Sequence, residues 1–167
     1  HWLFIILASL ISLTLLLVLV GQLGWLQGTP PVDLGVHDGR LKPPSTTENS
    51  VSSQAALYPD HPQRNYAEIV PLAVQGDGLA TLTRIKVIVE SMDRARVVSS
   101  EAGYLYVQFT TKLLKFVDDA EFWFDPVNNV IHVRSASRIG RGDLGANRRR
   151  IESIRLKLAA ATECALC

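Results

Sequence analysis

The side chains of this 167-residue chain that could carry chemistry gather between positions 118 and 150. Two adjacent carboxylates, Asp118 and Asp119, are followed by the segment Arg134-Ser135-Ala136-Ser137-Arg138 and then by Asp143. Carboxylate, hydroxyl and guanidinium groups held close together could catalyse a hydrolysis, bind an anion or stabilise one another as ion pairs. The strands and helices that carry these groups decide which of them can meet.

A predicted hairpin carries most of these groups. Its strands, Phe116 to Asp125 and Val130 to Arg138, flank a four-residue loop. Pairing Asp125 with Val130 gathers the apolar side chains on one inner face, and a shift by one residue would turn them outward. This register places Phe124 opposite Ile131, Phe122 opposite Val133, Ala120 opposite Ser135 and Asp118 opposite Ser137 on the inner face, and Trp123 opposite His132 and Glu121 opposite Arg134 on the outer face.

The same register argues against an enzyme. Neighbouring strand residues point to opposite faces, so Asp118 and Asp119 cannot share a substrate. Ser135 and Ser137 lie on the inner face, whereas His132 lies on the outer face. The sequence has no nucleophile-elbow, zinc-protease or phosphate-loop motif. We therefore predict no Ser–His–Asp site, no catalysis, no cofactor and no metal site. A hydrolase that uses the Asp, Ser and Arg cluster is the least favoured alternative.

The other elements predict a single α+β domain. The order of strand, helix, four strands and helix is typical of an antiparallel sheet with two helices on one face. The expected elements are an edge strand within Tyr66–Val74, a helix over Gly78–Met92 capped by Asp77, strands over Arg96–Ser100 and from Tyr104 onward, the hairpin, and a helix from Leu144 to about Ala161 capped by Asp143, with Asn147, Ile151, Ile154 and Leu158 facing inward.

Most of the polar cluster has a structural interpretation. Asp118 and Asn147 point toward the interior, where a buried carboxylate needs donors such as Ser137 and the amides that begin the last helix. On the outer face, carboxylates and arginines form a ladder of ion pairs across the strands. The structural set is Asp118, Asp119, Glu121, Ser135, Ser137, Arg138, Asp143, Asn147 and Arg150.

The outer face of the sheet also predicts a docking surface. Both helices are expected on the other face, so this one is bare unless a partner covers it. Aromatic and arginine side chains together are typical of interaction hot spots. The predicted partner-binding residues are Tyr104, Tyr106, Trp123, His132, Arg134 and Arg148.

The first twenty-six residues predict a membrane anchor. From Trp2 to Leu26 no side chain is charged, and a helix of this length spans a hydrocarbon core of about 30 Å. The run is longer than the apolar part of a signal peptide and lacks a good cleavage site. After it, Asp33 and Asp38 precede the first basic residue, Arg40, which favours an extracytoplasmic domain, in a periplasm or an organellar lumen.

The expected organisation is an anchor over residues 1–26, a Pro/Ser-rich tether over 27–65, the α+β domain over 66–161 and a tail over 162–167. The net charge of +1 gives no field that would favour nucleic acid. Cys164 and Cys167 form a lone C-x-x-C pair without a second ligand pair or a thioredoxin-like context.

Three motifs in order resemble the bacterial and chloroplast family known only as the domain of unknown function number fourteen ninety-nine. They are F-V-D-D-x-E-F from Phe116, R-S-A-S-R-x-G from Arg134 and D-x-G-x-N-R-x-R from Asp143. The family often carries Asn-Cys-Val-Ser-Ser-Gln before these motifs. This chain has Ser50 in place of that cysteine, which rules out a cysteine nucleophile there. The resemblance implies a fold class and no activity.

These observations favour a single-span membrane protein whose domain binds or scaffolds, as an accessory subunit of a membrane protein complex. Self-association through the spanning helix, where Ala8 and Ser12 form a small-x-x-x-small pair, and through the outer sheet face is a further expectation. The alternative is a protein that binds a lipid headgroup or a small anionic ligand.

Overall fold

The structure, a computed structural model, describes the backbone of residues 1–165 and the side chains of residues 1–161. The elements are α1 (Trp2–Gln22), β1 (Ser50–Ser52), the 3-10 helix η1 (Ala55–Leu57), α2 (Arg64–Ala67), β2 (Leu72–Ala73), α3 (Gly78–Glu90), β3 (Ala95–Glu101), β4 (Tyr104–Thr110), β5 (Val117–Asp125), β6 (Val130–Ser137) and α4 (Ala146–Ala165). The predictions for the Cys164 and Cys167 side chains lie outside the described part of the chain.

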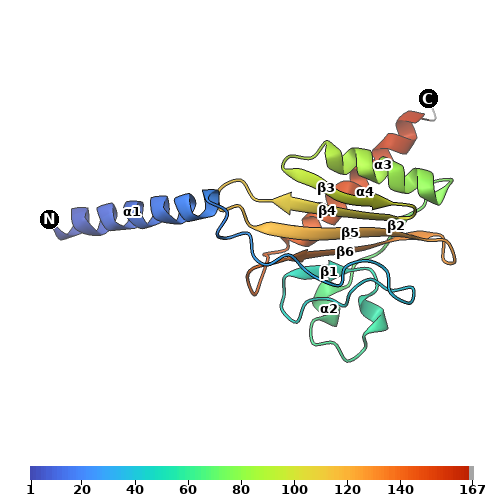
Figure 1. Ribbon diagram of the computed structural model, residues 1–167, viewed down its shortest axis with the longest axis horizontal. Helices are drawn as coiled ribbons and strands as arrows, with labels where there is room; N and C mark the ends of the chain where they lie inside the picture. The colour runs from blue at the N-terminus through green and yellow to red at the C-terminus, as the bar shows by residue number, and fades with distance from the viewer. Residues whose placement is uncertain (166–167) are drawn as a thin grey trace.

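One antiparallel sheet organises the domain, in the order β1-β6-β5-β4-β3, with β2 pairing the far half of β6 (Figure 1). The predicted register of the hairpin is confirmed from Asp125↔Val130 through Glu121↔Arg134 to Asp118↔Ser137. Alternation on β4 buries Leu105, Val107 and Phe109, as predicted. The inner and outer faces of the sheet are therefore those that the hydrophobic pattern selects.

Helices α3 and α4 cover the inner face (Figure 1). Asp77 caps α3 by accepting a hydrogen bond from the Ala80 amide at 2.7 Å. Asp143 caps the start of α4 by accepting from the amides of Gly145 and Asn147. The predicted α+β fold with two helices on one face is confirmed. Its core joins the inward residues of the sheet to the helix stripes Leu82, Ile85, Val89 and Ile151, Ile154, Leu158.

The expected edge strand within Tyr66–Val74 is mostly wrong. A short helix, α2, occupies its first residues, and only Leu72–Ala73 pairs with the sheet. The reason lies in α4, because Arg155 donates hydrogen bonds to the carbonyls of Val70 and Pro71. Side chains of α4 thus satisfy backbone groups that a strand would have satisfied by pairing.

The segment between α1 and β1 does not hang free. Residues 27–49 run across the outer face of the sheet, and β1 continues directly into the sheet (Figure 1). Leu41 is 1% exposed, and its amide donates to the Gln54 side chain at 2.8 Å. The prediction that the outer face is bare is wrong over β5 and β6, because the chain covers these two strands with its own proline-rich segment. We call residues 27–49 the strap.

Helix α1 projects from one end of the sheet (Figure 1). It is long and apolar enough to cross a membrane, with a mean hydropathy of 3.0 over its best window. Nearly all of its large apolar side chains are exposed. Its last turn contacts the loop between β4 and β5, since the Gln22 amide donates to the carbonyls of Lys112 and Leu113 at 3.3 and 2.9 Å.

Candidate functional site

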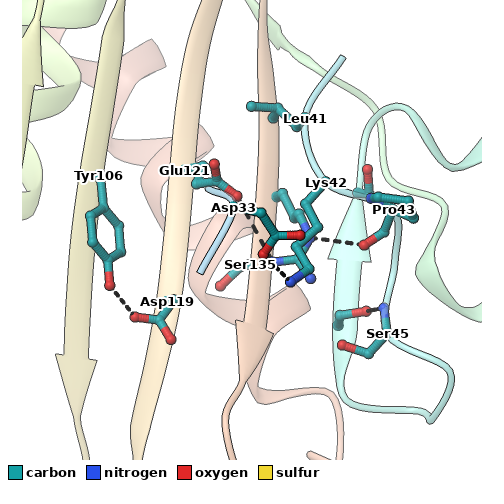
Figure 2. Close-up of polar contacts among 12 residues, drawn as sticks. Asp33, Leu41, Lys42, Pro43, Ser45, Tyr106, Asp119, Glu121 and Ser135 are labelled. Carbon is teal, nitrogen blue, oxygen red and sulfur yellow. Dashed lines mark hydrogen bonds and ion pairs between the residues drawn. The ribbon is translucent and has the colours of Figure 1, made fainter. Parts of the chain in front are cut away.

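The outer face of β5 and β6 carries four charged residues that the strap buries. Asp119 and Arg138 form a two-pronged ion pair, with nitrogen–oxygen distances of 2.7 and 2.8 Å. The Tyr106 hydroxyl donates to the same Asp119 carboxylate at 2.5 Å (Figure 2). The hydrogen bond to Asp119 is the main cause that raises the pKa of Arg138. This pair is therefore fully compensated.

Glu121 is the most buried charged residue of this face, with no exposed surface. Its Oε1 accepts hydrogen bonds from the Gly35 amide of the strap and from the Tyr104 hydroxyl, both at 2.8 Å. Its Oε2 is buried without a hydrogen-bond partner. Burial raises the pKa of Glu121, and the bonds from Gly35 and Tyr104 and the charge of Arg134 only partly oppose this rise.

Arg134 faces Glu121 but is poorly paired. Its Nη1 lies 3.9 Å from Glu121 Oε2, which is beyond hydrogen-bond distance. Among the described residues its side chain makes one hydrogen bond, from Nε to the carbonyl of Pro43 at 3.1 Å. Burial lowers the pKa of Arg134, opposed by the charges of Glu121, Asp119 and Asp33. A guanidinium has five N–H donors, so most of its donor capacity is not used within the protein.

A pocket of about 520 Å³ opens beside Arg134, between the strap and the end of the sheet near α1. Figure 2 shows Asp33 and Lys42 of the strap in front of β6, Pro43 and Ser45 beside β1, and Asp119 on β5. The residues that line this pocket are Thr29, Pro31, Asp33, Lys42, Pro43, Pro44, Ser45, Thr46, Asp119, Arg134, Ala136, Ser137 and Arg138.

The charges of this pocket do not cancel. Lys42 pairs with Asp33 at 2.7 Å, and Arg138 pairs with Asp119. The nearest carboxylate to Arg134 is Glu121, which lies 3.9 Å away and does not line the pocket. Arg134 also has little access to solvent, because its side chain is 6% exposed. The lining itself carries three cations and two carboxylates, and Arg134 is the cation whose guanidinium is least used by hydrogen bonds within the protein.

The residues of the inner polar cluster pair with one another. Asp118 pairs with Arg150 at 2.5 Å, and the Arg150 guanidinium also lies 4.6 Å from the centre of the Phe109 ring. Asn147 donates to Asn49, Ser137 and Asp143 and accepts from Ser135. The prediction that Ser137 and the amides at the start of α4 donate to Asp118 is wrong. Ser137 bonds to Asn147, the amides bond to Asp143, and the partner of Asp118 is Arg150.

Arg148, a predicted partner-binding residue, makes hydrogen bonds within the domain. It donates to the carbonyls of Tyr66 and Glu68 at 2.5 and 3.0 Å, which fixes the segment after α2 against the start of α4. The Tyr66 hydroxyl in turn donates to Asp143 at 2.5 Å. Burial acts to raise the pKa of Asp143, but hydrogen bonds from Tyr66, Asn147 and Gly145 outweigh it and lower that pKa.

The remaining predicted binding residues are partly covered. Trp123 stacks on His132 with ring centres 5.5 Å apart, and the strap passes next to Trp123 at Gly39. His132 Nδ1 lies 3.0 Å from Ser53 Oγ, and His132 Nε2 lies 3.5 Å from Asp125 Oδ2. The structure thus brings together a serine, a histidine and an aspartate, which the sequence argument had excluded.

Two members of this trio also bond to the backbone or to the hairpin turn. Ser53 Oγ accepts a hydrogen bond from the Val133 amide at 2.9 Å, and Asp125 holds the hairpin turn through Val127 and Asn128. Ser53, His132 and Asp125 line none of the pockets described in this structure. Within the described part of the chain, no cluster of three His, Cys, Asp or Glu side chains is placed to hold a metal ion.

Sequence reasoning missed the part of the pocket that the strap supplies, above all Asp33, Lys42 and Pro43. A proline-rich segment has no periodicity from which its buried side could be found. The segment from Asn49 to Gln54, which resembles the Asn-Cys-Val-Ser-Ser-Gln of the family, is the signal that could have indicated this part of the pocket. Ser50 is fully buried, and its hydroxyl accepts from the Ser45 amide at 2.8 Å, which ties the strap to β1 where the family often has a cysteine.

A family model described as "Protein of unknown function (DUF1499)" matches residues 40–158, which include the second half of the strap and the whole sheet. No match was found among curated proteins or among solved structures. The matched region covers well over half of the chain, from the strap residues beside Arg134 to the end of the buried stripe of α4. The chain belongs to the DUF1499 family.

Proposed function

We propose that this chain is a membrane-anchored, extracytoplasmic binding protein that holds a small anion, a carboxylate or phosphate group, in the pocket beside Arg134. One observation carries the proposal: a buried arginine lines the pocket while its nearest carboxylate stands off at 3.9 Å. A buried cation that is poorly paired is costly. An anion in the pocket would supply the missing charge and accept hydrogen bonds from the planar guanidinium.

The shape of the pocket supports a small ligand. Its volume of about 520 Å³ lies within the range of small-molecule sites. Lys42 at the rim adds a second cation, although it is 31% exposed and already paired with Asp33. The carboxylates of Asp33 and Asp119 would repel an anion, but each is held by its own cation. The proposed ligand therefore docks on Arg134 itself.

The location proposed for the domain rests on the anchor. Helix α1 supports membrane attachment, and the absence of Lys and Arg between this helix and Arg40 favours the extracytoplasmic side. A protein partner on the outer face loses its main support, because the strap occupies that face. A role as an accessory subunit, with self-association through Ala8 and Ser12 of α1, stays a prediction.

We expect binding without catalysis. The hydroxyl of Ser53 is engaged by the Val133 backbone, and Ser50 is engaged by the strap. A nucleophile must have its reactive atom open to the substrate. Neither serine meets that requirement, so neither is proposed as a nucleophile.

The test is ligand-induced stabilisation of the detergent-solubilised chain. Inorganic phosphate and citrate, titrated at constant ionic strength, should raise the unfolding temperature, since a tenfold excess over Kd stabilises by about 1.4 kcal/mol. Arg134→Lys retains the charge but loses the planar fork, and we expect about tenfold weaker binding.

Lys157→Met removes an exposed cation of α4 and should bind as the wild type does. A stabilisation of equal size in wild type and Arg134→Lys would contradict the proposal, as would the lack of any response to either anion. Micelles that contain phosphatidylglycerol form a separate arm. A response to these micelles alone, lost in Arg134→Lys, would identify a lipid headgroup as the source of the anion.

A further inference from the structure

The end of the sheet next to α1 has features that the pocket does not use. Strand β4 ends, β5 begins and β6 ends at this edge, so the β4–β5 loop and the β6–α4 loop lie side by side there (Figure 1). We call these two loops, residues 111–116 and 138–145, the proximal edge. Two leucines of this edge, Leu113 and Leu144, are 60% and 93% exposed.

The attachment of α1 sets the distance between the proximal edge and the bilayer that α1 would span. Helix α1 has 21 residues, which gives a length of about 30 Å, close to the thickness of a hydrocarbon core. Gln22 is its last residue and hydrogen-bonds to the carbonyl of Leu113 at 2.9 Å. Wherever the end of α1 lies in a bilayer, the backbone of Leu113 lies within one hydrogen bond of it.

A glycine makes this contact close. A Cβ atom added at Gly21 would come within 2.7 Å of the Leu114 backbone, so a larger residue would push the helix off the loop. Gly21 is also the one residue of α1 that the domain buries. The helix and the loop are therefore in direct backbone contact.

The chemistry of the proximal edge fits a lipid headgroup layer. Exposed Lys112 and Arg141 and half-buried Lys115 carry positive charge next to the leucines. Arg94 lies at the same end with Asp93 beside it at 3.6 Å, and Glu48 pairs with Gly142 across the second loop. Cations outnumber acids, and exposed leucines between cations are typical of surfaces that lie in a membrane interface.

We propose that the proximal edge lies in the headgroup layer of the bilayer that α1 spans, with Leu113 inserted at the acyl boundary and Lys112 and Lys115 on lipid phosphates. This inference rests on the membrane anchoring in the proposed function and adds a second contact to it. The domain would then have a fixed orientation, with the mouth of the Arg134 pocket close to the lipid surface.

The test places a fluorophore at one of two exposed apolar positions, which lie at opposite ends of the sheet. In a Cys164→Ser, Cys167→Ser background, Leu113→Cys marks the proximal edge. Val127→Cys marks the β5–β6 turn, where the native side chain is 89% exposed. Each variant of the full chain is labelled with a nitrobenzoxadiazole dye and reconstituted into vesicles of phosphatidylcholine and phosphatidylglycerol. Lipids with a nitroxide near the headgroup then report quenching.

We expect nitroxide lipids to quench the label at position 113 severalfold more than the label at position 127. Gly21→Leu keeps α1 apolar but breaks its contact with the loop, and it should reduce the quenching at position 113. If the protein floats with the vesicles but both labels are quenched equally and weakly, this proposal is overturned. The proposed membrane anchoring by α1 would still stand. Failure of the protein to float with the vesicles would instead contradict the anchor.

Discussion

Two buried carboxylates of strand β5, Asp118 on the inner face and Glu121 on the outer face, have different partners. Asp118 has a direct partner in Arg150, whose guanidinium also packs on Phe109. Glu121 has hydrogen-bond donors but keeps its arginine at a distance. The poor pairing of Arg134 beside a pocket is the reason that we propose a ligand there, whereas the close pairing of Asp118 gives no such reason.

Removal of Asp118 should therefore be costly. Asp118→Ala leaves Arg150 near Phe109 without its counter-ion, and we expect a loss of about 3 kcal/mol in the free energy of unfolding. Urea unfolding followed by circular dichroism measures it. The double variant Asp118→Leu, Arg150→Met should recover much of the loss, and Lys157→Ala should change the free energy by less than about 0.5 kcal/mol. A single variant as stable as wild type would contradict the structural role.

His132 predicts a specific pH dependence of stability. Burial lowers the pKa of His132 below its ordinary value of 6.5, and Asp125 only partly opposes this. As pH falls below about 6.5, His132 takes up a proton in the unfolded chain before it does so in the folded protein. The free energy of unfolding therefore decreases as pH falls from about 6.5 toward the pKa of His132 in the folded protein. His132→Asn keeps an acceptor for Ser53 and should flatten that decline between about pH 5 and 7.

Comparing wild type with His132→Asn isolates the contribution of His132 to the pH dependence of stability. Glu121, whose pKa is raised, contributes the opposite slope above its ordinary value of 4.5, but it does so in both proteins. Urea unfolding at several pH values gives the difference directly. Parallel curves for wild type and His132→Asn would contradict the shift at His132.

At the scale of elements, periodic segments could be predicted and the strap could not. The hairpin register follows from the alternation of Phe122, Phe124, Ile131 and Val133, since any shift would expose them. Asp77 and Asp143 mark their helices because few other arrangements satisfy the first amides of a helix. Both signals are local.

The strap is positioned by contacts with residues far along the chain. Gly35 reaches Glu121, Pro43 reaches Arg134, and Gly28 lies against Arg138 and Ile139. No local pattern of prolines and threonines contains this information. The outward charges of β5 and β6 could be predicted, but not that the chain itself would cover them. The candidate pocket needs both parts, so only its floor could be predicted.

Leu41 is the apolar residue whose loss should release the strap. Its burial of 99% in a segment without regular structure implies that Leu41→Ala costs about 2–4 kcal/mol and loosens residues 27–49. Limited proteolysis of the full chain in detergent, read by mass spectrometry, should show new cuts within the strap. Leu57→Ala, at a leucine that is 44% exposed, is the matched control. Rapid cleavage of the strap in wild type would contradict a docked strap.

At the scale of the whole molecule, one axis relates the anchor, the pocket and the far turn. Helix α1 leaves one end of the sheet, the pocket lies near that end, and the β5–β6 turn is at the opposite end (Figure 1). A bilayer around α1 would therefore leave Val127, with 89% of its surface exposed, as a residue far from the lipid. This position can report on which side of the membrane the domain lies.

The charges near the span predict the proposed orientation. Positive residues are retained on the cytoplasmic side, and here Asp33 and Asp38 come before Arg40 on the C-terminal side of α1. In spheroplasts of a bacterial host, Val127→Cys in the background without Cys164 and Cys167 should react with a membrane-impermeant maleimide before lysis. A cytoplasmic protein with an engineered cysteine controls for leakage. Reaction only after lysis would place the domain in the cytoplasm, and the ligand of the Arg134 pocket would then have to be a cytoplasmic anion.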